Sequence, residues 1–354
     1  LLSGAVYGIY SDSGCTNKVQ ELTTDSNGYA KSKALVAGTY YLKEIKAPNK
    51  YVISNKVHTL TVKAGQTTGV TATDKEQLGA ITICKEGEVL SGWNGSNFTY
   101  EKKYLPGATF KVTAGADIYK ADGTKVYNKD DVIKEAVTTG IDGKVIVTDL
   151  HLGTYVVIET GTIDGYTINT TPQTVDIQYK DQTVDIQYEA TSIYNTRQKA
   201  QVSVVKKDSD TENPLDGGKY TLYAANDIKN YAGSVIVTKG TALQTVTTGE
   251  NGVAAYTVDI PIANGYYITE TQAPYAYTRN QRDTYSFNFN YLSNTTPTAT
   301  FSHTFKNDRT TAKIHIYKVD KETGKAVPQG DAKLEGAVYG LYARNDISHP
   351  DGAT

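Results

Sequence analysis

The segment Ile81-Thr82-Ile83-Cys84-Lys85 places an apolar residue at every second position and ends in a lysine. Two further copies of this phrase are Val202-Ser203-Val204-Val205-Lys206 and Ile314-His315-Ile316-Tyr317-Lys318. Side chains in a β-strand alternate between two faces, so each lysine points the same way as the apolar residues before it. A lysine that faces a core is costly unless it is paired, neutral or consumed by a reaction. The inward lysine therefore needs a chemical explanation.

Three other phrases repeat in step with the lysine phrase. A Leu-x-Gly-Ala-like phrase begins at Leu2, Leu105, Leu215 and Leu334. A tyrosine-rich strand phrase ends in Glu44, Glu159 and Glu270. A closing phrase ends in Asp74, Asn195 and Asn307. By the same alternation, these acids and carboxamides share a face with apolar residues two positions earlier. Each complete unit therefore directs an amine, a carboxyl group and a carboxamide at one interior.

The period of the repeat predicts the domain organisation. Successive lysines are about 110 to 120 residues apart, which is the size of one small domain and too long for a solenoid repeat. We predict a partial domain at 1–77 that lacks its first strand, a complete domain with insertions at 78–198, a complete domain at 199–309, and the N-terminal part of a further domain at 310–354. This pattern is expected of a segment from a longer array.

Composition predicts an all-β fold. The chain has 31 Gly, 28 Tyr and no Met, and turn signals such as Asp142-Gly143 and Asn251-Gly252 separate alternating segments. Short strands in such units favour tandem immunoglobulin-like antiparallel β-sandwiches, arranged end to end. Two segments, 91–104 and 114–134, are interpreted as insertions. An exact repeat, 173–179 and 182–188, is expected to form a hairpin or an extension.

Several classes of function are disfavoured. The net charge of −2 with interspersed signs indicates no nucleic-acid partner, and no apolar run is long enough for insertion into a membrane. No phosphate loop, metal-binding spacing or nucleophile elbow is present, so we expect neither an enzyme nor a cofactor. Two cysteines cannot make a disulfide scaffold. Cys15 and Cys84 are expected to be free thiols, and a bridge between them is the alternative.

The inward groups can react with one another if the first and last strands of a domain are neighbours. Burial disfavours the charged forms of both an amine and a carboxyl group. A neutral lysine can then attack the carboxamide of an asparagine and expel ammonia, while the glutamic acid moves protons. The alternative is a buried ion pair or hydrogen-bonded triad that does not react. Residue spacing alone leaves both interpretations open.

The combined phrases resemble the Cna-B or SpaA-type domains of Gram-positive surface proteins and pilins. Glu44 is followed by Ala47-Pro48 and Tyr51, and Glu270 is followed by Ala273-Pro274 and Tyr277. The second unit departs from this pattern because no proline follows Glu159 before Tyr166.

The resemblance implies spontaneous isopeptide bonds in the two complete domains. Lys85 would join Asn195 with the assistance of Glu159, and Lys206 would join Asn307 with the assistance of Glu270. Glu44 and Asp74 match the assisting acid and the acceptor of a set without a lysine, and Lys318 matches a donor without partners. Such a bond would tie together the strands at which a pulling force enters and leaves the domain.

We therefore expect a structural stalk of a bacterial adhesin or pilus, extracellular and either anchored to the cell wall or part of a filament. Its partners would be neighbouring domains or subunits of the same fibre. One alternative is a ligand-binding adhesin in which the insertion around Trp93 contacts host matrix or glycan. Another is the repeating subunit of an extracellular filament whose chain ends pair with neighbouring chains.

Overall fold

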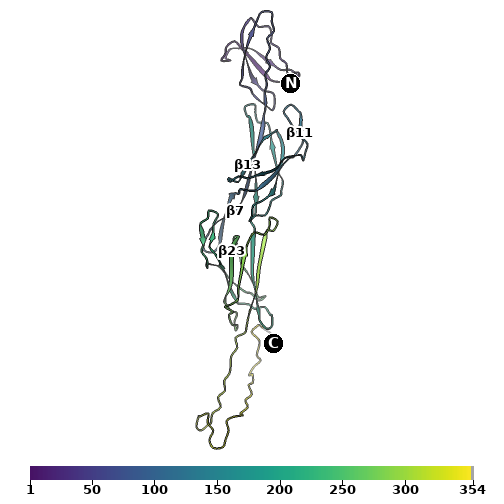
Figure 1. Ribbon diagram of the computed structural model, residues 1–354. Helices are drawn as coiled ribbons and strands as arrows, with labels where there is room; N and C mark the ends of the chain where they lie inside the picture. The colour runs from purple at the N-terminus through teal and green to yellow at the C-terminus, as the bar shows by residue number, and fades with distance from the viewer. Residues whose placement is uncertain (352–354) are drawn as a thin grey trace. The chain divides into compact units, whose positions relative to one another are not determined.

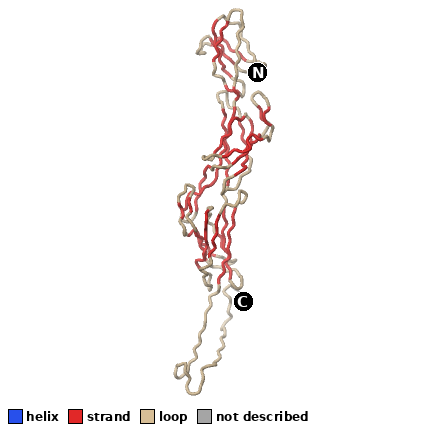
Figure 2. The backbone as a smooth tube through the Cα atoms, in the orientation of Figure 1, coloured by secondary structure: helices blue, strands red, loops and turns tan. Residues whose placement is uncertain are grey.

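The computed structural model describes residues 1–351, apart from the side chain of Asn264, and their regular structure consists of strands. Strands are drawn in red in Figure 2, and loops in tan. Residues 1–351 contain no helix, and so they contain no helix that is long and apolar enough to cross a membrane. The all-β prediction is confirmed.

The chain forms two compact units, which are described separately. The first contains residues 1–89, 101–197 and 293–297. The second contains residues 90–100, 198–292 and the chain from 298 onward. The end of one long hairpin, at 90–100, thus belongs to the second unit, and the loop at 293–297 belongs to the first.

Residues 1–77 form one four-stranded antiparallel sheet and a small strand pair. The sheet order is β2 (Lys18–Thr23), β1 (Val6–Tyr10), β3 (Gly38–Lys46) and β5 (Val57–Val62). The pair is β4 (Tyr51–Val52) with β6 (Lys75–Glu76). Tyr7, Ile9 and Leu42 are buried on one face of the sheet. The glutamate phrase ending in Glu44 lies in β3, beside β1.

The second domain is a sandwich of two sheets. One sheet has the order β12 (Val132–Thr138), β9 (Thr109–Ala114), β14 (Gly153–Gly161) and β15 (Gln173–Ile177). The other has the order β13 (Lys144–Leu150), β7 (Leu78–Trp93) and β16 (Ile186–Asn195), and β8 (Phe98–Tyr104) pairs with the end of β7. Phe110 and Tyr155 from the first sheet pack with Ile81, Ile83 and other apolar residues of the second. Strands β7 and β13 are labelled in Figure 1.

The third domain repeats this arrangement. One sheet has the order β21 (Ala242–Thr247), β18 (Lys219–Ala224), β23 (Ala263–Gln272) and β24 (Thr284–Phe289). The other has the order β22 (Val253–Ala255), β17 (Lys199–Asp208) and β25 (Thr298–Asn307). The core includes Tyr220, Leu222, Tyr266, Phe289 and Phe305. Tandem β-sandwich domains are thus confirmed.

The structure corrects three details of the predicted domains. The segment 114–134 contains the hairpin β10 (Ile118–Tyr119) and β11 (Lys125–Tyr127), which has a counterpart in the third domain, β19 (Ile228–Lys229) and β20 (Val235–Val237). It is therefore not an insertion peculiar to the second domain. The repeats at 173–179 and 182–188 do not form a hairpin, because β15 pairs with β14 and β16 pairs with β7. Residues 310–351 form no strand, and Ile314 is 68% exposed.

Both cysteines are free thiols, so the alternative of a disulfide between Cys15 and Cys84 is not formed. Cys15 lies in the loop between β1 and β2 with a positive φ of 54°. Cys84 is buried, although it alternates with Ile83 and Lys85 and so points to the opposite face of its strand. Its strand is flanked by β13 on one side and β16 on the other, where Lys144 and Ser192 are its register partners.

Candidate functional site

The lysine strand and the Asn strand of each complete domain are direct neighbours. Strand β7 is parallel to β16, and β17 is parallel to β25. These two pairs differ from the antiparallel pairing that was predicted for the sandwich as a whole. Lys85 is the register partner of Ile193, and Lys206 is the register partner of Phe305. Each Asn lies two residues beyond that partner. Because side chains two residues apart share a face, Lys and Asn point into the same interior.

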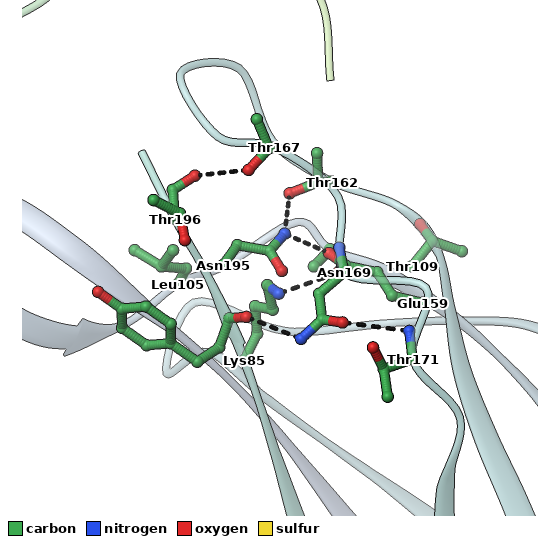
Figure 3. Close-up of polar contacts among 12 residues, drawn as sticks. Lys85, Leu105, Thr109, Glu159, Thr162, Thr167, Asn169, Thr171, Asn195 and Thr196 are labelled. Carbon is green, nitrogen blue, oxygen red and sulfur yellow. Dashed lines mark hydrogen bonds and ion pairs between the residues drawn. The ribbon is translucent and has the colours of Figure 1, made fainter. Parts of the chain in front are cut away.

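In the second domain Glu159 bridges Lys85 and Asn195 (Figure 3). Lys85 Nζ donates to Glu159 Oε2 over 3.0 Å, and Asn195 Nδ2 donates to Glu159 Oε1 over 2.8 Å. All three residues are at most 1% exposed. One carboxylate therefore contacts both the amine and the carboxamide nitrogen, inside a site closed to bulk water.

Burial changes the chemistry of this site. It lowers the pKa of Lys85, an effect that the charge and hydrogen bond of Glu159 partly offset. A larger fraction of the amine is thereby neutral and nucleophilic than for a lysine in water. Asn195 Oδ1 is buried and accepts no hydrogen bond from the described residues. The carbonyl oxygen that would gain charge during attack is therefore not yet engaged.

The third domain builds the same set with one additional donor. Asn307 Nδ2 donates to Glu270 Oε1 over 2.8 Å and to Oε2 over 3.0 Å. Lys206 Nζ lies 3.4 Å from Glu270 Oε1, and burial lowers the pKa of Lys206. Tyr220 donates its hydroxyl to Glu270 Oε1 over 3.0 Å. Lys206, Glu270 and Asn307 are each at most 2% exposed.

The first domain places two carboxyl groups where the other domains place a carboxyl group and a carboxamide. Glu44 is 1% exposed, and burial, reinforced by the neighbouring Asp74, raises its pKa to about 7. Burial also raises the pKa of Asp74. Within the described residues no lysine forms a hydrogen bond with Glu44 Oε1 or Asp74 Oδ1, and Lys318 is exposed in the loop that follows β25.

Backbone amides hold all three glutamates, which the sequence analysis did not anticipate. Ser54 N donates to Glu44 over 2.7 Å, Asn169 N to Glu159 over 2.9 Å, and Asn280 N to Glu270 over 3.1 Å. Each donor is ten residues beyond its glutamate. The constant spacing from a glutamate to a following Tyr and then to this position is the signal that could have revealed it.

Two side chains at the sites were also missed. Tyr220 contacts Glu270, whereas the second domain has Phe110 at the corresponding place in its Leu-x-Gly-Ala-like phrase. In the second domain Thr162 Oγ1 instead accepts a hydrogen bond from Asn195 Nδ2 over 2.7 Å. The two sites therefore share their three central groups but differ in the hydroxyl that supports them.

The insertion around Trp93 packs on a core rather than standing free. Trp93 is half-buried, with its ring 4.6 Å from that of Phe98, and both pack with the core cluster of the second unit. Tyr100 donates its hydroxyl to Asp259 O over 2.9 Å, and Tyr231 N donates to Leu90 O over 2.8 Å. These contacts fix the insertion against the core cluster of the second unit.

One group of described side chains has the composition of a metal site. Asp208, His349 and Asp351 each place a ligand atom within 4.8 Å of the others. Protein donors already engage both carboxylates. Tyr277 donates to Asp208 over 2.7 Å, and Asn213 donates to Asp351 over 3.1 Å. We therefore assign no metal to this group.

Comparisons with known proteins agree with the fold. The family described as SpaA, prealbumin-like fold domain, matches residues 1–76, 99–192 and 200–304. The trypsin-resistant surface T6 protein of Streptococcus pyogenes serotype M6 is 39% identical over 61 residues, which are 17% of this chain and 11% of that protein. The matched segment thus spans about a tenth of the length of this relative.

Two solved structures are also similar. The Bacillus anthracis TIE protein aligns with a TM-score of 0.54 and 24% identity, over 87% of this chain and 48% of that one. BcpA, the major pilin subunit of Bacillus cereus, aligns with a TM-score of 0.34 and 20% identity, over 87% of this chain and 95% of that one. Because the family matches three successive segments that together exceed half of the sequence, the chain belongs to the SpaA family of prealbumin-like fold domains, carried in tandem.

Proposed function

We propose that the chain is a structural stalk of a Gram-positive surface fibre or pilus, in which two domains are locked by intramolecular isopeptide bonds. The observation that carries this proposal is the same buried contact in two domains, where one glutamate touches both a lysine amine and an asparagine carboxamide. Membership of the SpaA family and the surface and pilin proteins among its relatives support the extracellular setting.

The geometry of the second domain suggests how its Lys85–Asn195 bond forms. Lys85 Nζ attacks the carboxamide carbon of Asn195 and loses a proton to Glu159 Oε2, the oxygen that it contacts. Glu159 Oε1 contacts the departing nitrogen and delivers a proton to it. The C–N bond of the carboxamide breaks, ammonia leaves, and a Lys–Asn amide remains. The glutamate gains one proton and gives one up, so it ends in its starting protonation state. The reaction occurs once in each domain because it consumes the lysine and the asparagine, and it needs no cofactor or external substrate.

The bond joins two neighbouring strands near opposite ends of the domain sequence. Force applied along the chain would enter at β7 and leave at β16, and a covalent link between these strands would block extension of everything between them. Forced unfolding is governed by the unfolding rate, which such a link reduces far more than hydrogen bonds do. A stalk that resists shear and proteolysis follows from this arrangement.

Proteolytic digestion followed by tandem mass spectrometry tests the proposal. We expect branched peptides that join Lys85 to Asn195 and Lys206 to Asn307, each lighter than its two linear components by about 17 Da for the lost ammonia. Linear peptides with unmodified Lys85 and Lys206 as the sole products would contradict it. Recovery of both branched peptides from protein that has the mass of one chain before digestion would exclude links between chains.

A further inference from the structure

The segment that holds each glutamate also contacts a second partner. In the first domain Ser54 N donates to Glu44, while the preceding amide, Ile53 N, donates to Gln182 O over 2.8 Å. In the second domain Asn169 N donates to Glu159, while the preceding amide, Ile168 N, donates to Asn294 O over 2.9 Å. In both cases two consecutive amides connect a glutamate to a loop from later in the chain.

The two partner loops occupy equivalent places in the fold. Gln182 lies in the loop between β15 and β16, and Asn294 lies in the loop between β24 and β25. Both loops precede the Asn-bearing last strand of the domain that follows the glutamate. The contact is thus made each time by the next domain along the chain. It also gives the repeated sequence at 182–188 a structural role, because its first residue supplies the carbonyl group.

A buried glutamine immediately before each complete domain secures the same loop. Gln77 Oε1 accepts a hydrogen bond from Lys180 N over 2.9 Å, and Gln198 Oε1 accepts one from Leu292 N over 3.0 Å. Both glutamines are 1% exposed. Gln77 Nε2 also donates to the carbonyl groups of Asp181 and Val184, over 2.9 Å and 2.6 Å. Each loop is therefore fixed by the glutamine and presents its carbonyl to the preceding domain.

We propose that the segment after the glutamate strand is a positioning element in the first and second domains, through which docking of the next domain's loop holds Glu44 beside Asp74 and holds Glu159 against Lys85 and Asn195. Successive amides of an extended segment point to opposite sides. When one amide of the segment is hydrogen-bonded to the next domain, the neighbouring amide that bonds to the glutamate is therefore held more firmly in place. The Lys85–Asn195 bond then forms at its full rate only when the 290–297 loop of the third domain is docked.

The predicted effect on the rate of the Lys85–Asn195 bond rests on the proposed function. The predicted positioning of Glu159 by the Asn169 amide does not. The step concerned is attack of Lys85 Nζ on the Asn195 carboxamide with release of ammonia. The full chain carrying Gln198→Ala loses the acceptor that fixes the 290–297 loop, and it leaves Lys85, Glu159 and Asn195 unaltered. Gln198→Glu keeps an acceptor oxygen at that position and serves as the rescue variant. Gln77→Ala is the matched control, because it loosens the equivalent loop beside Glu44 instead.

The first readout is the time course of both cross-linked peptides during cell-free synthesis. In Gln198→Ala we expect the Lys85–Asn195 link to form about fivefold more slowly, the equivalent of one hydrogen bond. The Lys206–Asn307 link should keep its normal rate, which also reports that the third domain has folded. Gln198→Glu and Gln77→Ala should form the Lys85–Asn195 link at the normal rate. An unchanged rate for this link in Gln198→Ala would overturn the inference.

The second readout, hydrogen exchange of the Asn169 amide, does not require the reaction. We expect this amide to exchange about fivefold faster in Gln198→Ala and at the normal rate in Gln77→Ala. Unchanged exchange in Gln198→Ala would overturn the positioning role even if the cross-links form. Conversely, absence of both links in the unsubstituted chain, with faster Asn169 exchange in Gln198→Ala, would reject the proposed function and retain the positioning role.

Discussion

Asn195 lies two residues beyond Ile193, the parallel register partner of Lys85, so the two side chains face one interior from neighbouring strands. Asn307 has the same relation to Phe305 and Lys206 in the third domain. A register slip of one residue would place lysine and asparagine on opposite faces. The reactive set is therefore a property of strand register as much as of residue identity.

Removing one assisting acid should release one bond only. In Glu159→Ala we expect the measured mass to lie about 17 Da below the mass calculated for that variant, where the unsubstituted chain lies about 34 Da below its own calculated mass, and we expect the second domain to lose about 4 kcal/mol of stability, comparable to the loss of a long-loop cross-link. The measurements are intact mass and thermal unfolding. Glu135→Ala, at a glutamate whose side chain is 77% exposed, should keep the deficit of about 34 Da against its own calculated mass and should unfold as the unsubstituted chain does. A cross-link that forms fully without Glu159 would show that the acid is dispensable.

Mechanical extension should distinguish locked from unlocked domains. In single-molecule pulling from the two chain ends, the second and third domains of the unsubstituted chain should not extend, because the link joins β7 to β16 and β17 to β25. Lys85→Met should add one extension event from the second domain. Lys111→Met, at a partly exposed lysine on β9, is the control and should add none. Extension of both domains in the unsubstituted chain would contradict the proposed lock.

The hydroxyl of Tyr220 should support the site of the third domain. Tyr220→Phe removes its hydrogen bond to Glu270, and we expect the third domain to lose about 1 to 2 kcal/mol before the cross-link has formed. Chemical denaturation in a Lys206→Met background measures this loss without the covalent bond. Tyr223→Phe, on the same strand, is the comparison variant. Equal stability of the two variants would indicate that the Tyr220 hydroxyl has no special role.

The stability of the first domain should fall as the pH rises through the range in which Glu44 titrates. The pKa of Glu44 is raised from 4.5 to about 7 by burial and by Asp74, so the folded state binds more protons than the unfolded state between these values. Stability is then greatest below about pH 4.5 and is lost as the pH approaches and passes 7. Hydrogen exchange of the amides in β1 across this range measures the effect.

Glu44→Gln is the control for this pH dependence, because its carboxamide does not titrate and the slope should flatten. The raised pKa of Asp74 acts in the same direction and leaves a smaller residual slope. A first domain that becomes more stable between pH 4.5 and 7 would contradict the assignment of Glu44 as a buried, mostly protonated acid at the lower pH.

The sequence reveals the strands and their inward groups because period-two alternation is local. Lys85, Glu159 and Asn195 can each be assigned to a face from their immediate neighbours. That β7 and β16 are adjacent and parallel is a non-local property, which the sequence analysis only assumed. The amide of Asn169 carries no side-chain signature, and only its spacing of ten residues from Glu159, which the other two domains share, could have revealed it.

Other features of the structure also depend on non-local packing. The aromatic residues around Trp93 pack with the core cluster of the second unit, which is formed mainly by residues far away in the sequence. The identical sequences at 173–179 and 182–188 adopt different structures because each pairs with a different strand. The alternation at 314–318 predicted a strand, but in the described residues no sheet pairs with it and its apolar side chains are exposed.

Intact mass spectrometry of the unsubstituted chain, under conditions that unfold it, tests the central claim most directly. Two Lys–Asn bonds require a mass about 34 Da below the value calculated from the sequence, with each bond accounting for one molecule of ammonia. A mass equal to the calculated value would mean that Lys85 and Lys206 are merely buried beside Glu159 and Glu270, and it would contradict the account of a covalently locked stalk.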